Sequence, residues 1–148
     1  MSSAKNEILE ADFGLGFTYT RSPGLIMGKF LAALKQRRLY GIRRTNGEIL
    51  FPPTEYDPIS AAELDEFVAV EPSGEVVSWT WLDQPREHHQ VDGAFAFALI
   101  KLDGADTPFL HRLFCDDPAS IKAGMKVTVQ WQAETCGSIN DIRGFVPA

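Results

Sequence analysis

The sequence predicts a mainly β protein, in which a small barrel of strands is preceded by one helix and a short hairpin. Apolar residues recur at helical spacing only near the N-terminus, between residues 23 and 39. From residue 41 onward the apolar runs are short and separated by turn residues, with no repeating helix between them. A chain of 148 residues with 45% hydrophobic content is long enough for one domain with a small appendage.

The helix is expected to begin at Ser22-Pro23 and to run to about Leu39. Serine can cap a helix, and proline is tolerated at the first helical position. The preceding residues, 1–21, are polar and contain glycine, so they are expected to form an extended arm. The apolar anchors of this arm are Phe13, Leu15 and Phe17.

The strands are expected where short apolar runs are bounded by turn residues. A strand at 48–51 is stopped by Pro52-Pro53, because proline cannot donate to a ladder. Three hairpins should follow, joining 66–70 to 75–82, 94–102 to 108–114, and 126–133 to 140–146. Five or six strands in this order fit a small Greek-key barrel of the OB type.

Composition disfavours nucleic-acid binding. The net charge is −6 and the pI is about 5.0, whereas a nucleic-acid-binding face needs cations that displace counterions from phosphates. Trp79 and Trp81 share one face of a strand and could stack on bases, as in nucleic-acid-binding OB-folds. We expect them instead to fill the barrel or to cover it against the helix.

Compartment and redox state follow from what the sequence contains. The first residues have no apolar leader, and no apolar run approaches the length of a membrane helix, so a cytoplasmic location without membrane attachment is expected. Cys115 and Cys136 are accordingly expected to be two reduced thiols and not a disulfide.

Four short phrases stand out along the chain: GEILFPP (47–53), VSWTW (77–81), FALI with LDG (97–104) and GMKV (124–127). Together they resemble the thiolase-associated OB-fold family, also called domain-of-unknown-function thirty-five. Members pair a rubredoxin-like zinc ribbon with an OB-fold, and they accompany thiolase-like, acyl-CoA-using enzymes. The resemblance covers nearly the whole chain. It implies an arm and helix at 1–40, a ribbon-like hairpin at 41–63 and a five-stranded OB-fold barrel at 64–148.

The chain departs from this family at the metal site. A zinc ribbon needs two Cys-x-x-Cys knuckles, and the matching positions here are Arg43, Asn46, Asp57 and Ser60. Because these side chains cannot complete a closed zinc shell, a metal-free ribbon is expected, with a rebuilt oxygen-ligand site as the alternative. An ion pair between Arg43 and Asp57 is expected to join the two former knuckles.

The histidines and cysteines do not assemble a catalytic group in the sequence. His88 and His89 lie in a polar loop without the spacing of metal ligands, so a solvated loop is expected. His111 lies within a strand and is expected to be a core or interface histidine. Cys115 follows four residues later, about 13 Å along a strand, which is too far for a His–Cys hydrogen bond. No catalytic residue is therefore assigned.

The densest cations are the candidate binding residues. They are Lys35, Arg37, Arg38, Arg43 and Arg44. They could read the phosphates of coenzyme A, or dock an acidic partner surface, or be a solvated helix end.

The resemblance implies a non-catalytic accessory subunit. Such a subunit would bind a thiolase-like enzyme, either a thiolase or a side-chain-cleaving aldolase as in steroid degradation, and help to hold or channel an acyl-CoA. The catalytic residues would lie in the partner, no cofactor would be tightly bound, and a coenzyme A thioester would be the ligand. The alternatives are a stand-alone nucleic-acid-binding OB module and an independent small enzyme acting on CoA esters.

Overall fold

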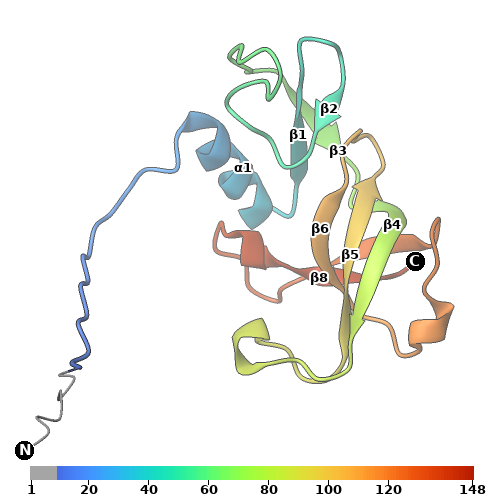
Figure 1. Ribbon diagram of the computed structural model, residues 1–148. Coiled ribbons are helices and arrows are strands. Elements are labelled where there is room, and N and C mark those ends of the chain that lie inside the picture. Colours follow the sequence, from blue (N-terminus) through green and yellow to red (C-terminus); the bar gives the residue numbers. More distant parts are fainter. Residues whose placement is uncertain (1–9) are drawn as a thin grey trace, which may run out of the picture.

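A helix, a three-stranded sheet and a closed barrel follow one another along the chain (Figure 1). The structure, a computed structural model, describes residues 10–148, so the first nine residues of the expected arm lie outside the described residues. Helix α1 spans Leu25–Lys35. The three-stranded sheet contains β1 (Leu39–Arg43), β2 (Ile49–Leu50) and β3 (Phe67–Val70). The barrel contains β4 (Ser73–Leu82), β5 (Phe95–Leu102), β6 (Phe109–Leu113), β7 (Lys126–Trp131) and β8 (Ile142–Pro147).

The barrel confirms the predicted fold class. Its strands close in the order β4-β5-β6-β8-β7, with β6 and β8 parallel and the other neighbours antiparallel. This is the Greek-key order of a five-stranded OB-fold. Alternation along β5 builds the interior, since Ala96, Ala98, Ile100 and Leu102 are all buried.

The helix is shorter than the sequence suggested. It begins at Leu25, just after Ser22-Pro23, and ends at Lys35 instead of near Leu39. Arg37 has a φ of 57°, a left-handed conformation that ends the helix and turns the chain into β1. The sequence does not predict strand β1, because Leu39, its first residue, falls within the apolar spacing of the helix. One face of α1 packs on the core through Ile26, Phe30, Ala33 and Leu34.

The expected hairpin of 66–70 with 75–82 is wrong. The strand β3 pairs with β1, with Leu39 opposite Val70 and Ile42 opposite Phe67. The strand β4 pairs with β5 and β7 instead. Closing the barrel occupies both edges of β4, so the chain changes sheets over the two residues between β3 and β4. The predicted pairs β5–β6 and β7–β8 are confirmed.

The turn between β5 and β6 joins the barrel to the three-stranded sheet. The carboxylate of Asp106 accepts from the backbone N–H of Ile49 at 2.8 Å, and the Asp106 N–H donates to the Ile49 carbonyl at 2.9 Å. The Thr107 hydroxyl accepts from the N–H of Phe51 at 2.9 Å. The Phe51 ring in turn contacts Phe109 edge-on, at 5.1 Å between ring centroids. The sheet and the barrel thus share one core.

Candidate functional site

The structure divides the five candidate cations into two groups. Lys35, Arg37 and Arg38 lie where α1 ends, whereas Arg43 and Arg44 lie at the far end of β1. Five residues of strand separate Arg38 from Arg43, a span of about 17 Å. The five side chains therefore do not form one patch.

Two residues of the helix-end group border a hollow where β1 begins and β3 ends. Arg37 and Arg38 line this hollow, whose volume is about 210 Å³. Its other walls are Leu39, Tyr40, Ala69, Val70 and Pro72. We call it the helix-end hollow. Two arginines and several apolar residues border it, which is an arrangement suited to an organic anion.

The three helix-end cations have different surroundings. Arg37 donates to the carbonyl oxygens of Gln132 and Ala133 at 3.2 and 3.0 Å, so it ties the helix end to the chain after β7. Lys35 and Arg38 are exposed, and neither forms an ion pair within residues 10–148. These two charges are available to a ligand or a partner.

Arg43 pairs with a different carboxylate from the one expected. Its Nε lies 2.8 Å from the carboxylate of Glu66, and its Nη1 donates to the Gly47 carbonyl at 3.2 Å. The predicted Arg43–Asp57 ion pair is therefore wrong. Adjacent residues at a strand end point to opposite sides, and Arg44 is the one that faces Asp57.

Asp57 and Arg44 form a largely buried ion pair, here called the clasp, between the two segments that the resemblance aligns with zinc knuckles. The Asp57 side chain is fully buried and accepts from Arg44 Nε at 3.1 Å and Nη2 at 3.2 Å. It also accepts from the Thr45 hydroxyl at 3.1 Å and from the N–H groups of Ile59 and Ser60 at 2.8 and 3.0 Å. The hydrogen bond from Arg44, followed by the backbone N–H groups, holds the pKa of Asp57 well below its usual range. The carboxylate is therefore charged at neutral pH.

The clasp lies in the segment where the resemblance to a zinc ribbon would place a metal. Five donors already surround the two oxygens of Asp57. The amide of Asn46 is engaged with Glu48, at 3.0 Å from its carboxylate. Within residues 10–148, no three His, Cys, Asp or Glu side chains gather as a metal site would require. The oxygen-ligand alternative is not assembled there, and the absence of bound zinc stays a prediction.

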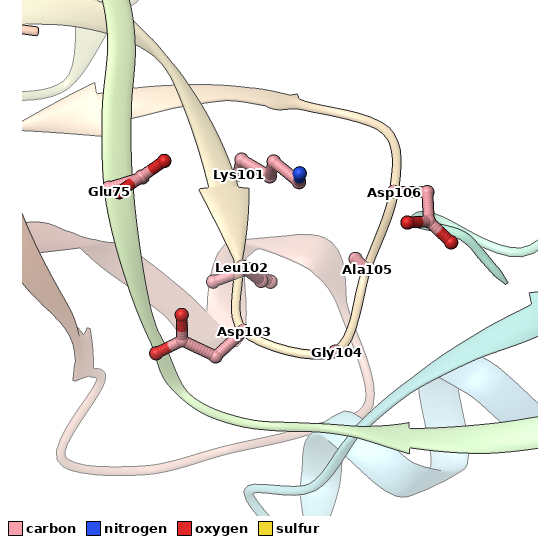
Figure 2. Close-up of a pocket in the computed structure, with 7 residues that line it drawn as sticks. All are labelled: Glu75, Lys101, Leu102, Asp103, Gly104, Ala105 and Asp106. Atoms are coloured by element: carbon pink, nitrogen blue, oxygen red, sulfur yellow. The ribbon is translucent and has the colours of Figure 1, made fainter. Parts of the chain in front are cut away.

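The turn between β5 and β6 borders a second hollow, of about 370 Å³ (Figure 2). Its side chains include three carboxylates and one amine, from Glu75, Asp103, Asp106 and Lys101. All three carboxylates are already engaged, since Asp103 accepts from Ser73, Asp106 accepts from Ile49 and Glu75 pairs with Lys126. The excess of negative charge makes this hollow unsuitable for a phosphate.

The histidines and cysteines considered in the sequence analysis do not come together in one site within the described residues. His88 and His89 lie in a short 3₁₀ turn, Glu87–His89, where Nδ1 of His89 accepts from the N–H of Arg86 at 2.9 Å. The Cys115 thiol lies 3.0 Å from the Ser120 hydroxyl, and Cys115 and Cys136 are both free thiols, as expected. The structure shows no contact between His111 and Cys115 among the described residues.

The two strand tryptophans differ. Trp81 packs against the core, and its indole N–H donates to Asp83 at 2.7 Å. Trp79 is 40% exposed, so the expectation that both rings fill or cover the barrel is wrong for Trp79.

His111 lies in the barrel between two aromatic rings. Its ring centroid is 5.2 Å from that of Phe109 and 5.8 Å from that of Phe145. Its Nδ1 is buried and has no hydrogen-bond partner in the described part of the chain. Burial, with the nearby charge of Arg112, lowers the pKa of His111 to about 4.

This histidine predicts a pH-dependent loss of stability. The unfolded chain protonates His111 near its ordinary pKa of about 6.5, while the folded chain stays neutral down to about 4. Stability should therefore fall as the pH is lowered between these two values, by roughly 3 kcal/mol at most. Urea unfolding from pH 7 to pH 4 should show a smaller fall for His111→Leu. The exposed His88→Leu variant is the control, and an equal fall in wild type and His111→Leu would contradict the assignment.

No helix within residues 10–148 is both long and apolar enough to cross a membrane.

Comparison with known proteins identifies the barrel. Residues 67–132 match the family model described as ChsH2, C-terminal OB-fold domain. No curated protein matches the chain. A solved structure named "Ltp2-ChsH2(DUF35) aldolase" is 24% identical with a TM-score of 0.61, and the match covers 80% of this chain and 91% of that one.

A second solved structure has the same architecture. It is a DUF35-family protein of unknown function from Sulfolobus solfataricus, 20% identical with a TM-score of 0.54, and the match covers 68% of this chain and 74% of that one. At these sequence identities the two solved structures establish only the fold. The family model shows which residues match an OB-fold domain. Residues 67–132 therefore match the ChsH2 C-terminal OB-fold domain, and most of the chain has the fold of these two solved structures.

Proposed function

We propose that this chain is a non-catalytic subunit that binds a thiolase-like enzyme, either a thiolase or a side-chain-cleaving aldolase, and helps to hold its acyl-CoA substrate. The observation that most supports the proposal is the likeness, over 80% of the chain, to the structure named as an Ltp2-ChsH2(DUF35) aldolase. That name pairs a DUF35 component with an aldolase. By analogy the partner of this chain is an enzyme of the same broad class, in the cytoplasm.

The absence of an assembled catalytic group supports a subordinate role. Within residues 10–148, Cys115 contacts Ser120 and the carbonyl of Asp117, and no base lies beside it. His111 is buried between aromatic rings with its Nδ1 unpaired. A nucleophile needs a base within hydrogen-bond reach, so the chemistry is assigned to the partner.

The helix-end hollow is the proposed contact for coenzyme A. Coenzyme A carries a 3′-phosphate and a pyrophosphate, which guanidinium groups bind with charge-assisted hydrogen bonds. Arg38 and Lys35 are exposed and carry charges that nothing in the described chain neutralises. Arg43 and Arg44 are paired with carboxylates of their own chain, so the proposal assigns them to the ribbon-like segment and not to phosphate.

A tagged form of the chain, expressed in its native host, tests the proposed partnership. We expect a thiolase-like enzyme to co-purify in a fixed ratio through a second, size-based separation. The control is the same chain unfolded by heat and used as bait. A chain that returns alone from the host lysate, with a thiolase-like enzyme demonstrably present in that lysate, would contradict the proposal.

A further inference from the structure

The chain begins its described part with an extended arm that runs away from the folded body (Figure 1). Large apolar side chains occupy alternate positions of this arm. They are Phe13, Leu15, Phe17 and Tyr19, with exposed fractions of 88, 70, 78 and 78%. In an extended chain, alternate residues lie on one face. The four side chains therefore form an apolar stripe about 20 Å long.

The residues between them are small. Gly14 and Gly16 alternate with the apolar residues, and a Cβ added at either glycine would meet nothing within 4 Å. Glycine within a strand pattern marks a place where another backbone approaches closely. Glycine also weakens a strand that has no partner. The arm has the alternation of a strand, and no strand within residues 10–148 pairs with it.

We propose that this arm, residues 13–19, adds as a strand to an open sheet edge of the thiolase-like partner and seats its apolar side chains in pockets there. The inference rests on the proposed function, which supplies the partner, and adds the mode of binding. Strand addition derives affinity from main-chain hydrogen bonds and specificity from pockets for alternate side chains.

A second copy of this chain is a poor acceptor. The barrel is closed, and a closed barrel offers no edge strand. The edges of the three-stranded sheet are β2, with two residues, and β3, with four. The stripe from Phe13 to Tyr19 is seven residues long and needs a longer edge.

A lipid surface is also a poor acceptor. Residues 10–21 contain two carboxylates, Glu10 and Asp12, and a single cation, Arg21. Segments that bind the cytoplasmic leaflet combine apolar residues with lysines and arginines, which the anionic lipids attract. An apolar stripe with acidic neighbours on a chain of net charge −6 favours a protein surface.

The first test changes the stripe. The Phe13→Ser, Phe17→Ser double variant of the full chain is titrated against the thiolase-like enzyme that co-purifies with it, by isothermal titration calorimetry. We expect the Kd to rise at least about 10-fold, with an unchanged thermal midpoint because the arm does not support the body. The matched control is Thr18→Ser, Thr20→Ser, on the other face of the arm. An unchanged Kd in the phenylalanine variant would overturn the inference and leave the proposed function standing.

The second test separates strand addition from side-chain docking. Proline cannot donate a main-chain hydrogen bond, and the N–H groups of residues 15 and 16 point to opposite edges of the arm. Gly16→Pro is compared with Gly16→Ala, and Leu15→Pro with Leu15→Ala. Strand addition predicts that one proline variant binds about 10-fold more weakly than its alanine counterpart. Equal affinities within both pairs would overturn strand addition.

The same samples test the alternative acceptors. If the wild-type chain alone forms dimers that the Phe13→Ser, Phe17→Ser change abolishes, the occupant is a second copy and the inference is wrong. If the wild-type chain binds no thiolase-like enzyme, the proposed function fails and the inference fails with it.

Discussion

Replacing Asp57 with alanine is expected to lower the thermal midpoint of unfolding by on the order of 10 °C. The change leaves the Arg44 guanidinium, 13% exposed, with the more exposed carboxylate of Glu48 as its remaining ion-pair partner. It also removes the acceptor of the Thr45 hydroxyl and of the N–H groups of Ile59 and Ser60. Removing one partner from a buried, hydrogen-bonded pair is costly because the other partner stays desolvated. Differential scanning calorimetry at neutral pH measures the effect.

The matched control is the exposed ion pair of the same segment. Glu66→Ala breaks the Arg43–Glu66 pair, whose side chains are both exposed. Exposed pairs contribute little, so we expect a shift of about 2 °C or less. Equal shifts in Asp57→Ala and Glu66→Ala would show that the clasp does not stabilise the ribbon-like segment.

The clasp also predicts the response to metal and to acid. If Asp57 and Arg44 replace the metal of a ribbon, a chelator should leave the thermal midpoint of the wild-type chain unchanged, and elemental analysis should find far less than one zinc per chain. The pKa of Asp57 is lowered in the folded state, so its contribution is present at neutral pH. That contribution is lost as the pH falls below the unfolded value of about 3.9. This window lies below the one assigned to His111.

Replacing Arg38 with glutamate is expected to weaken acyl-CoA binding by the complex about 10-fold at low salt, because a phosphate would meet a carboxylate in place of a guanidinium. Arg38 borders the helix-end hollow and has no ion-pair partner in residues 10–148. Added salt should weaken wild-type binding and reduce the difference between the two proteins. Titration calorimetry of the complex with an acyl-CoA, at two salt concentrations, measures both effects.

Arg43→Glu is the control for this prediction. Arg43 lies about 17 Å along the strand from Arg38 and is already paired with Glu66. A change there should leave the acyl-CoA affinity nearly unaltered. Equal losses of affinity in the two variants would mean that general charge, and not the helix-end hollow, controls binding. If the complex still assembles and both variants bind acyl-CoA as tightly as the wild type, Arg38 is a solvated residue at the helix end and does not bind the ligand.

The barrel was predictable because its sequence signals are local. The short apolar run of β5, and the Asp and Gly residues of its turn to β6, are visible in the sequence without knowing the partner strands. The strand β3 was assigned to the wrong partner for the opposite reason. The choice between β1 and β4 depends on barrel closure, a contact of long sequence separation that no short pattern reports.

The ribbon-like segment shows the same limit at the level of single residues. The sequence predicts an ion pair between an arginine and Asp57 in this segment. The predicted arginine is Arg43, whereas the structure pairs Asp57 with Arg44. Neighbouring residues point to opposite sides of a strand, so the choice depends on which side β1 turns toward Asp57. The five cations are close together in the sequence but do not form one cluster in the structure. Strand β1, which the sequence does not predict, separates the three at the helix end from Arg43 and Arg44.

The most direct test of the central claim is the rate at which the thiolase-like partner cleaves its acyl-CoA, measured with and without this chain at equal enzyme concentration. A non-catalytic subunit that helps to hold the substrate predicts no cleavage by the chain alone. It also predicts slow or absent cleavage by the partner alone, and a rate that rises to saturation as the chain is added. A partner that cleaves acyl-CoA equally well without the chain, or a chain that cleaves it alone, would contradict the account.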